Sequence, residues 1–444
     1  MIAIGLCGAA FIGCFVATRQ ALWAGIAASL AVGYLYGIIR ANLANPAAQF
    51  VYDAAIAGVF LAALAQRLDS AQRWRLRRLM PWVICLIGWP TMLLLVPSQN
   101  PWIQLVGWRG NVLFVPFILL GGLLDENTMR RLARSIGWLN LAVLLVAFAE
   151  VIWGVPRFYP FNAVDAIIYK STDVTFNGVN HYRIPATFTH SAAYATCMVA
   201  SIPLLVGALS LTRLRGERWF LLGAVGASAI GVFLAASRSE AVVLITIVMV
   251  TTVALGGRRI PRMAWVVLII VIAAIVAATP RLQRFFTLAN PEVVTARLHS
   301  SVNGSIIDLI EEYPLGNGLG GGGTSIPYFL KPLLHDPVAV ENEYGRIVLE
   351  QGLPGLLIWL GFMFWVLIRS APDRNDPWYV GRWLARLFCL ISFATAPLGT
   401  GLLNAIPQTA LTLMYCGWIA TSRQRPRLRT APRRPAARAV AASS

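Results

Sequence analysis

The sequence is poor in charged residues and in the side chains that build metal centres and disulfide frameworks. Only 13% of its 444 residues are charged, 57% are hydrophobic, and there are four His and six Cys. So few charges exclude a disordered chain, and so apolar a composition excludes an ordinary soluble globule. We therefore expect a polytopic membrane protein, whose main solvent is lipid.

The cysteines and histidines do not have the spacing of a ligand set. All six Cys fall inside apolar runs, at positions 7, 14, 85, 197, 389 and 416, where they are expected to pack as small hydrophobic residues. No His-x-x-Glu-His helix occurs, and the four His lack the short spacings of metal ligands. The sequence gives no reason to expect a disulfide framework, a metal centre or a cofactor.

Apolar runs long enough to cross a hydrocarbon core of ~30 Å recur from one end of the chain to the other. They lie near residues 2–17, 21–40, 51–66, 80–97, 109–124, 136–155, 191–211, 219–236, 241–256, 264–278, 353–368, 384–400 and 404–421. The predicted fold class is an all-α polytopic membrane protein with about 12–13 transmembrane helices. No basic segment precedes the first run, so we expect a span there and not a cleavable signal peptide.

Positive charge is in large excess, with a formal net charge of +18, and it is concentrated in short blocks between the apolar runs. The blocks lie at 73–78, 130–134, 213–218, 258–262 and 423–438. Such blocks mark the cytoplasmic ends of spans, so the charge indicates membrane topology and not a nucleic-acid partner. The parity of the spans then places 98–108, 156–190, 237–240 and 279–352 on the outer side, with an external N-terminus if there are thirteen spans.

This topology divides the chain into six parts. They are N-terminal transmembrane helices (1–155), a first outer segment (156–190), central transmembrane helices (191–278), a large outer loop (279–352), C-terminal transmembrane helices (353–421) and a basic cytoplasmic tail (422–444). The tail lacks apolar periodicity and is expected to be disordered and close to anionic lipid headgroups.

The large outer loop contains two distinctive elements. From about Glu292 to Tyr313, apolar residues recur every three or four positions, which predicts an amphipathic helix that lies on the membrane or packs on the bundle. The run from Pro314 to Gly323 is too rich in Gly to continue that helix. It is either a backbone cradle for a phosphate, although it lacks the Lys-Ser/Thr ending of a P-loop, or a flexible hinge.

Acidic and amide residues gather just before the apolar run at 353–368. Glu341, Asn342 and Glu343 stand there, followed by Arg346. Charged groups near hydrocarbon cost on the order of 2.5–3.5 kcal/mol each, so a cluster at a membrane edge usually marks a pathway or a reaction site. We interpret this cluster as one wall of an active site on the outer side. The alternative is that Glu341 complements the dipole of the helix that follows.

Three Arg residues at the outer ends of spans depart from the positive-inside pattern: Arg183, Arg238 and Arg297. A guanidinium at such a site must be paired or bound to an anion. Its planar fork of donors suits a diphosphate, whereas the alternative for Arg238 is an ion pair with Glu240. The outer His residues are interpreted first as hydrogen-bonded interface residues, with His335 kept as a candidate base.

Together these motifs resemble the O-antigen ligase and O-antigen polymerase superfamily of integral-membrane glycosyltransferases. The similar elements are a run like Pro-Leu-x-Gly-x-Gly (314–320) after an amphipathic helix with Arg297, an Arg before a Thr-Phe element (183–188), and a Ser-Arg at a span end (237–238). The ligase signature is a His followed by Asn, Ser or Gln, nine residues and Gly-x-x-Gly. Residues 342–355 fit this spacing, but Glu341 occupies the position of the His.

The resemblance covers roughly residues 183–360. It implies an inverting, metal-free transfer of a glycan from undecaprenyl diphosphate to a hydroxyl, at the periplasmic face of the bacterial inner membrane. The Glu-for-His difference favours a polymerase or an exopolysaccharide-type branch over a ligase proper, or a base role moved to His335. Another glycan or a lipid A-core type molecule is the implied acceptor.

On this basis we assign roles to six residues. Arg183 and Arg238 are expected to bind the diphosphate, with Arg297 in support. Glu341 is expected to take the acceptor proton, and Glu343 or His335 is the reserve base in the catalytic set.

A transporter or flippase for lipid-linked glycans is the alternative from another class. Its polar residues would lie at the bilayer midplane on broken helices, often in two repeated halves. The sequence shows no clear internal repeat, and its unusual charges gather near the outer edge. A peptidoglycan polymerase that uses a lipid carrier is a nearer alternative, and a structural scaffold leaves Arg238 and Glu341 unexplained.

Overall fold

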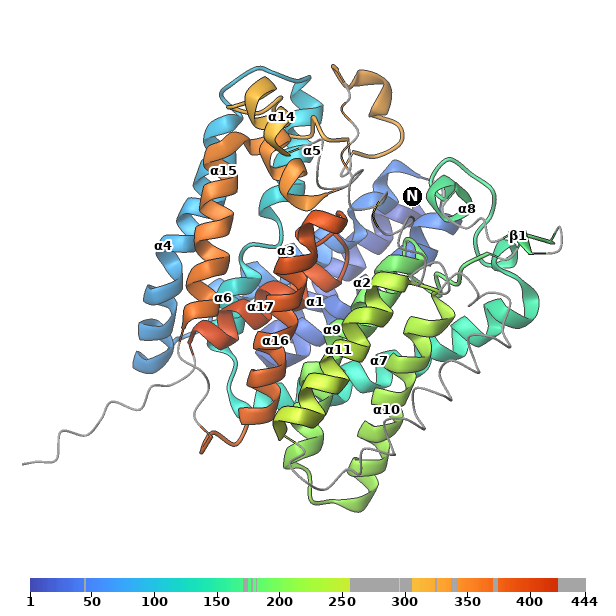
Figure 1. The fold of residues 1–444 in the computed structure, drawn as a ribbon, viewed down its shortest axis with the longest axis vertical. Coiled ribbons are helices and arrows are strands. Elements are labelled where there is room, and N and C mark those ends of the chain that lie inside the picture. Colours follow the sequence, from blue (N-terminus) through green and yellow to red (C-terminus); the bar gives the residue numbers. More distant parts are fainter. Residues whose placement is uncertain are drawn as a thin grey trace, which may run out of the picture.

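The computed structural model of the chain is a helical bundle with one small antiparallel sheet (Figure 1). It describes residues 1–43, 45–170, 175–176, 179–180, 182–255, 295, 306–323, 326–336, 338, 340, 342–369 and 374–421. The sheet pairs β1 (Thr175–Phe176) with β2 (Val179–Asn180), and the architecture is otherwise helical over these residues.

The N-terminal part of the bundle consists of helices joined by short connections. They are α1 (Ile2–Gln20), α2 (Leu22–Asn42), η1 (Pro46–Phe50), α3 (Val51–Leu64), α4 (Ser70–Leu93), α5 (Pro101–Val112), α6 (Phe117–Leu123), α7 (Glu126–Trp153) and η2 (Val155–Arg157). Carboxylates cap two of them, because Asp69 accepts a hydrogen bond from Gln72 N and Asp125 accepts one from Thr128 N.

The remaining helices complete the bundle. They are α8 (Ala166–Lys170), α9 (Ser191–Leu211), α10 (Arg215–Leu234), α11 (Arg238–Leu255), α14 (Ile306–Glu312), η5 (Lys331–Leu333), α15 (Glu343–Ile368), α16 (Tyr379–Thr395), η6 (Ala396–Leu398) and α17 (Gln408–Ala420). Of the cysteines that the sequence predicts to be core residues, Cys14, Cys197, Cys389 and Cys416 are buried, Cys7 is partly buried and Cys85 is exposed.

Within the described part of the chain, eight helical segments are long and apolar enough to cross a membrane. They are Ile2–Gln20, Leu22–Asn42, Pro46–Leu64, Pro101–Leu123, Glu126–Trp153, Ser191–Leu211, Arg215–Leu234 and Glu343–Ile368. Large apolar side chains point outward from them, such as Leu145 with 71% and Phe364 with 66% of its surface exposed. Such outward apolar surface suits a lipid solvent. The prediction of an all-α polytopic membrane protein is confirmed at this level.

Parts of two segments predicted to lie on the outer side, 98–108 and 279–352, meet near α5 and α14, at the top of Figure 1. The Gln99 side chain donates to the carbonyl oxygens of Asn317 at 3.0 Å and His335 at 2.9 Å. The basic blocks meet elsewhere, because Arg130 and Arg134 both pair with Glu217. Two of the predicted outer segments thus contact each other, and so do two of the basic blocks.

The Gly-rich run is a packed loop that completes an interrupted helix. Helix α15 breaks at Gly352, which has φ +69° and ψ −177°. Asn317 N donates to Leu349 O at 2.6 Å, and Leu353 N donates to Pro314 O at 3.0 Å. The loop therefore satisfies backbone groups that the break leaves without helical partners.

The predicted amphipathic helix at 292–313 is described only in part. Its last turns form α14, where Leu309 is buried and Ile307 is exposed, so the helix presents one apolar residue to the protein and another outward. Of residues 292–305, only Thr295 is described, in a helical position, and the rest lie outside the described residues.

Candidate functional site

A buried segment of the first outer loop forms the base of the candidate site. Ile184, Ala186 and Phe188 are fully buried, although this segment lies outside the helices. Phe188 packs between the rings of Tyr34 and Tyr194, at centroid distances of 5.2 and 5.4 Å. The segment is therefore part of the core, and the residues on either side of it have a defined place.

Arg183 precedes this segment and contacts the connection between α10 and α11. Its Nε donates to the carbonyl oxygen of Ala235 at 3.1 Å. Ala235 follows α10, and Arg238 begins α11 three residues later. Arg183 and Arg238 are both half-buried. The structure thus brings Arg183 close to the short turn that carries Arg238.

His190 follows the segment and caps α9. Its Nδ1 accepts a hydrogen bond from Ala193 N at 3.1 Å, which leaves the proton of the neutral ring on Nε2. Burial lowers the pKa of His190 to about 4, and the nearby guanidinium groups of Arg183 and Arg40 add to this effect. His190 is therefore a neutral donor beside two cations.

Arg40 was missed by the sequence analysis. It lies in the last turn of α2, and its Nη2 donates weakly to Val164 O at 3.4 Å. Its Nε is buried and has no hydrogen-bond partner among the described residues. An Arg at the outer end of a span is the same signal that identified Arg183, so the positive-inside rule applied to every span would have found it.

Asp165 completes this group and was also missed. Burial raises its pKa to about 6, although Arg40 nearby and a hydrogen bond from Asn162 oppose the shift. Its Oδ2 is buried and has no hydrogen-bond partner in the described residues. We call Arg40, Asp165, Arg183 and His190 the His190 cluster. It draws on α2, the 156–190 segment and the start of α9, and it combines two guanidinium groups with a neutral imidazole donor and one carboxyl group.

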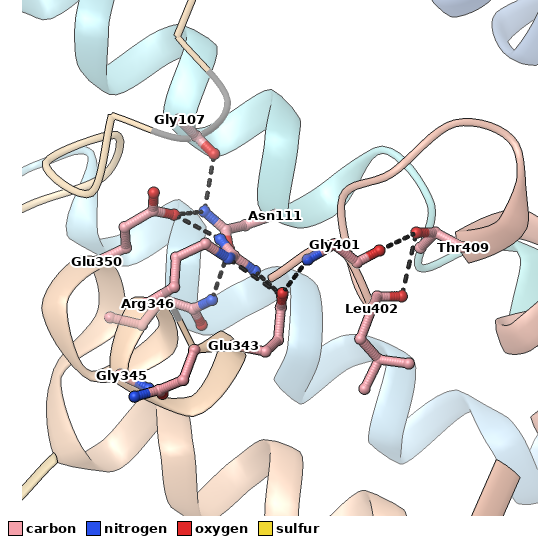
Figure 2. A network of polar contacts seen from close by, with 11 residues as sticks. Gly107, Asn111, Glu343, Gly345, Arg346, Glu350, Gly401, Leu402 and Thr409 are labelled. Carbon is pink, nitrogen blue, oxygen red and sulfur yellow. Dashed lines mark hydrogen bonds and ion pairs between the residues drawn. The ribbon is translucent and has the colours of Figure 1, made fainter. Parts of the chain in front are cut away.

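The acidic cluster of the sequence forms a second polar network (Figure 2). Arg346 donates to Glu343 Oε1 from Nη2 at 2.7 Å and to Glu350 Oε2 from Nη1 at 2.8 Å. Asn111 of α5 bridges the guanidinium and Glu350, since it accepts from Arg346 at 3.0 Å and donates to Glu350 at 2.7 Å. Gln351 also donates to Asn111, at 2.8 Å. All these side chains are buried.

Glu343 is therefore engaged on both oxygens. Its Oε1 pairs with Arg346, and its Oε2 accepts a hydrogen bond from Gly401 N at 2.7 Å. With no exposed surface, this carboxylate ties α15 to the loop before α17. Its geometry is that of a structural ion pair in a low-dielectric interior.

The Gly-rich loop lies directly against this network. A side chain at Gly322 would place its Cβ 3.2 Å from Glu350 Oε1, and Leu319 beside it is fully buried. The run therefore packs where backbone and a carboxylate approach closely, which explains its Gly content.

The other predicted residues differ in what the structure describes. His335 is exposed, and its backbone N and O both bond the Gln99 side chain, at 3.0 and 2.9 Å. Asn342 caps α15 by accepting from Gly345 N. Glu341 and Arg297, the expected base and the supporting diphosphate ligand, lie outside the described residues.

Comparisons with known proteins add no family to this geometry. No protein-family model matches the chain, and no curated protein matches its sequence significantly. Among the described residues, no group of three or more His, Cys, Asp or Glu side chains is arranged to hold a metal ion.

Proposed function

We propose that the protein is a membrane glycosyltransferase that moves a glycan from a polyprenyl diphosphate, undecaprenyl diphosphate in bacteria, to an acceptor hydroxyl. In this proposal the chain has about 12–13 spans, lies in the inner membrane and works at its periplasmic face. The acceptor is another glycan or a lipid A-core type molecule.

One observation carries the proposal. His190 lies within electrostatic range of both Arg40 and Arg183, and Arg183 bonds the turn that leads into Arg238. These cations come from segments far apart in the sequence, at the end of the bundle where the positive-inside rule predicts few of them. Guanidinium groups gathered in this way favour an anionic ligand, and a diphosphate offers several oxygens to bidentate donors.

The reaction requires charge stabilisation and one proton transfer. The bond between the anomeric carbon and the diphosphate oxygen breaks, and a bond from that carbon to the acceptor oxygen forms. The electron pair leaves with the diphosphate, where Arg183, Arg238 and Arg40 balance the growing charge. His190 adds a neutral donor, because its Nε2 carries the proton when Nδ1 caps α9.

The acceptor hydroxyl loses its proton to a base. The sequence assigns this role to Glu341, next to the cap residue Asn342. Glu343 is less suited to it, because both of its oxygens are bonded inside the protein and the side chain has no exposed surface. His335 remains the reserve, since its side chain is exposed at the same end of the bundle.

A reconstitution experiment tests the proposal. The purified protein in proteoliposomes is given a synthetic oligosaccharide on polyprenyl diphosphate and a glycan acceptor, without any nucleotide sugar. We expect a lengthened acceptor and an equal amount of released polyprenyl diphosphate, both measured by mass spectrometry. Transfer that requires a nucleotide sugar, or no transfer to any glycan or lipid A-core acceptor, contradicts the proposal.

A transporter of lipid-linked glycans is the second candidate, and the interruption of α15 at Gly352 favours it. Broken helices with charged residues line the sites of many transporters. Here, however, the loop at 314–317 bonds the backbone freed by the break, and the charges before it are paired with one another. Movement of labelled lipid-linked glycan across the bilayer, without transfer to an acceptor, would support the transporter.

A further inference from the structure

Glu150 is a buried carboxylate near the C-terminal end of a membrane-spanning helix. It lies in the last turn of α7 and has no exposed surface. Its Oε2 accepts a hydrogen bond from the backbone N of Ala186 at 2.9 Å, and its Oε1 has no hydrogen-bond partner among the described residues. A carboxylate at such a position costs free energy and usually has a function, so its single hydrogen bond to a backbone N–H is expected to matter.

The residue that it holds has an unusual backbone conformation. Ala186 has φ +53°, in the left-handed region that side chains other than Gly seldom adopt. Its carbonyl oxygen accepts a hydrogen bond from the Tyr159 hydroxyl at 2.8 Å, and the same hydroxyl also donates to Phe188 O at 2.8 Å. Glu150 and Tyr159 thus bond both polar groups of one strained residue.

This turn connects the cationic residues of the His190 cluster. Arg183 lies three residues before Ala186, and His190 lies four residues after it. The intervening backbone is also bonded to α2, because Ile38 N donates to Thr187 O at 3.1 Å. A different conformation at Ala186 would change the path of the chain on both sides of it. It would move Arg183 relative to Ala235 and His190 relative to the start of α9.

We infer that Glu150 is a positioning residue, which, with Tyr159, holds Ala186 in the turn that sets Arg183 and His190 in place for the donor diphosphate. The inference rests on the proposed function, since that function assigns Arg183 to the diphosphate. Glu150 and Tyr159 have no exposed surface with which to contact a substrate, so we expect their effect to pass through Arg183 and His190 to the binding of the donor and not to the acceptor.

Four variants separate this role from general destabilisation. Glu150→Ala removes the acceptor for Ala186 N. Glu150→Gln keeps an acceptor oxygen, and its new amide group replaces the oxygen that has no described partner. Tyr159→Phe removes the other half of the clamp with little change of shape. Tyr52→Phe is the matched control, because Tyr52 on α3 is equally buried and its hydroxyl has no described hydrogen-bond partner.

The measurements are kcat, the KM for donor and for acceptor, and the Kd of a short-chain polyprenyl diphosphate without glycan, by titration calorimetry in nanodiscs. We expect Glu150→Ala to raise the donor KM and the probe Kd about tenfold and Tyr159→Phe to raise both severalfold, as loss of one hydrogen bond suggests. The acceptor KM should not change. Glu150→Gln should restore most of the affinity, and Tyr52→Phe should match the unmodified protein.

The outcomes are distinguishable. Equal probe binding in Glu150→Ala, Tyr159→Phe and the unmodified protein overturns the positioning role, as does an equal loss of donor affinity in Glu150→Gln and Glu150→Ala. If Glu150→Ala does not fold, Tyr159→Phe decides by the same criterion. An unmodified protein that neither transfers glycan nor binds the probe contradicts the proposed function itself, whatever the variants do.

Discussion

Glu343 and Arg346, three residues apart on α15, form an ion pair of 2.7 Å in which neither side chain has any exposed surface. Arg346 also pairs with Glu350 one turn later, at 2.8 Å. The charges that precede the apolar run are thus, in part, an internal network that fixes the first half of α15 against α5. Charge near the membrane edge has a structural use here as well as a proposed catalytic one.

Arg346→Ala should destabilise the protein strongly. It would leave two carboxylates buried without their cation, and loss of one partner of a buried pair typically costs about 3–5 kcal/mol. The free energy of unfolding, from denaturant titration in mixed micelles, measures the effect. Arg134→Ala is the control, since Arg134 is 47% exposed and its partner Glu217 keeps Arg130, so we expect a change of about 0–1 kcal/mol. Similar losses in the two variants would argue against a buried network.

Glu341→Gln should impair glycan transfer, whereas Glu343→Gln should impair stability. If Glu341 takes the acceptor proton, Glu341→Gln abolishes glycan transfer and leaves insertion and folding intact. Glu343→Gln removes the charge that faces Arg346, so its main effect should be lower stability, with residual transfer by the molecules that remain folded. Transfer assays and unfolding curves on both variants check this. Full activity in Glu341→Gln removes the base assignment.

Arg183→Ala should lower kcat for glycan transfer about 100-fold, because loss of one positioned donor to a developing charge typically costs 10²–10³. Arg183→Lys should recover little, since a point charge does not reproduce the fork that bonds Ala235 O and an anion together. Arg238→Ala and Arg238→Lys should show the same losses of kcat as the corresponding Arg183 variants. Arg157→Ala, an exposed Arg in the same outer segment, is the control, and an equal loss in that variant would indicate a general effect of surface charge.

Gly352→Ala should destabilise the protein by about 1–3 kcal/mol, because the position has φ +69° and a Cβ there would lie 2.6 Å from the backbone carbon of Leu315. Gly223→Ala is the matched control, as nothing lies within 4 Å of its Cβ position in α10. It should stabilise the helix by roughly 0.5–1 kcal/mol. Unfolding titrations of both variants measure the difference, and equal effects would mean that the break in α15 does not depend on Gly.

His190 should make the protein less stable as the pH is lowered below 6.5. Its pKa is 6.5 ordinarily and about 4 in the folded protein. Below pH 6.5 the unfolded chain gains a proton that the folded chain does not bind, so this contribution is complete above pH 6.5 and is lost as the pH falls toward 4. His190→Asn should reduce the slope over this range. Since Asn also caps helices, the variant and the unmodified protein should have similar free energies of unfolding at pH 7.5. An unchanged slope contradicts the assignment.

The sequence predicted the membrane class because an apolar run can be recognised from a short stretch of sequence, without knowledge of distant contacts. Each of the eight spanning segments coincides with an apolar run, and the basic blocks at 130–134 and 213–218 do meet, through Glu217. Arg183 was identified by the same local reasoning, since a cation at the wrong end of a span is visible without any structure. The assignments to Glu341 and Arg297 stay predictions, because those residues lie outside the described part of the chain.

Other features were not predictable in this way. The sequence does not indicate that Arg40 lies near both His190 and Asp165, or that Glu150 bonds Ala186, because each pair joins segments whose proximity depends on helix packing. The Gly-rich run was expected to be a phosphate cradle or a hinge, and neither expectation included its close packing against Glu350.

The sequence alone determined the solvent of this protein and its approximate spans, since these depend on the transfer of individual residues between water and lipid. Tertiary structure decided which charges are paired. Glu343 is bonded within the core while Arg183 and His190 remain half-buried, and this difference depends on which distant segment packs against each side chain. Burial fixes the energetic cost of a charge, and only the packed bundle specifies burial.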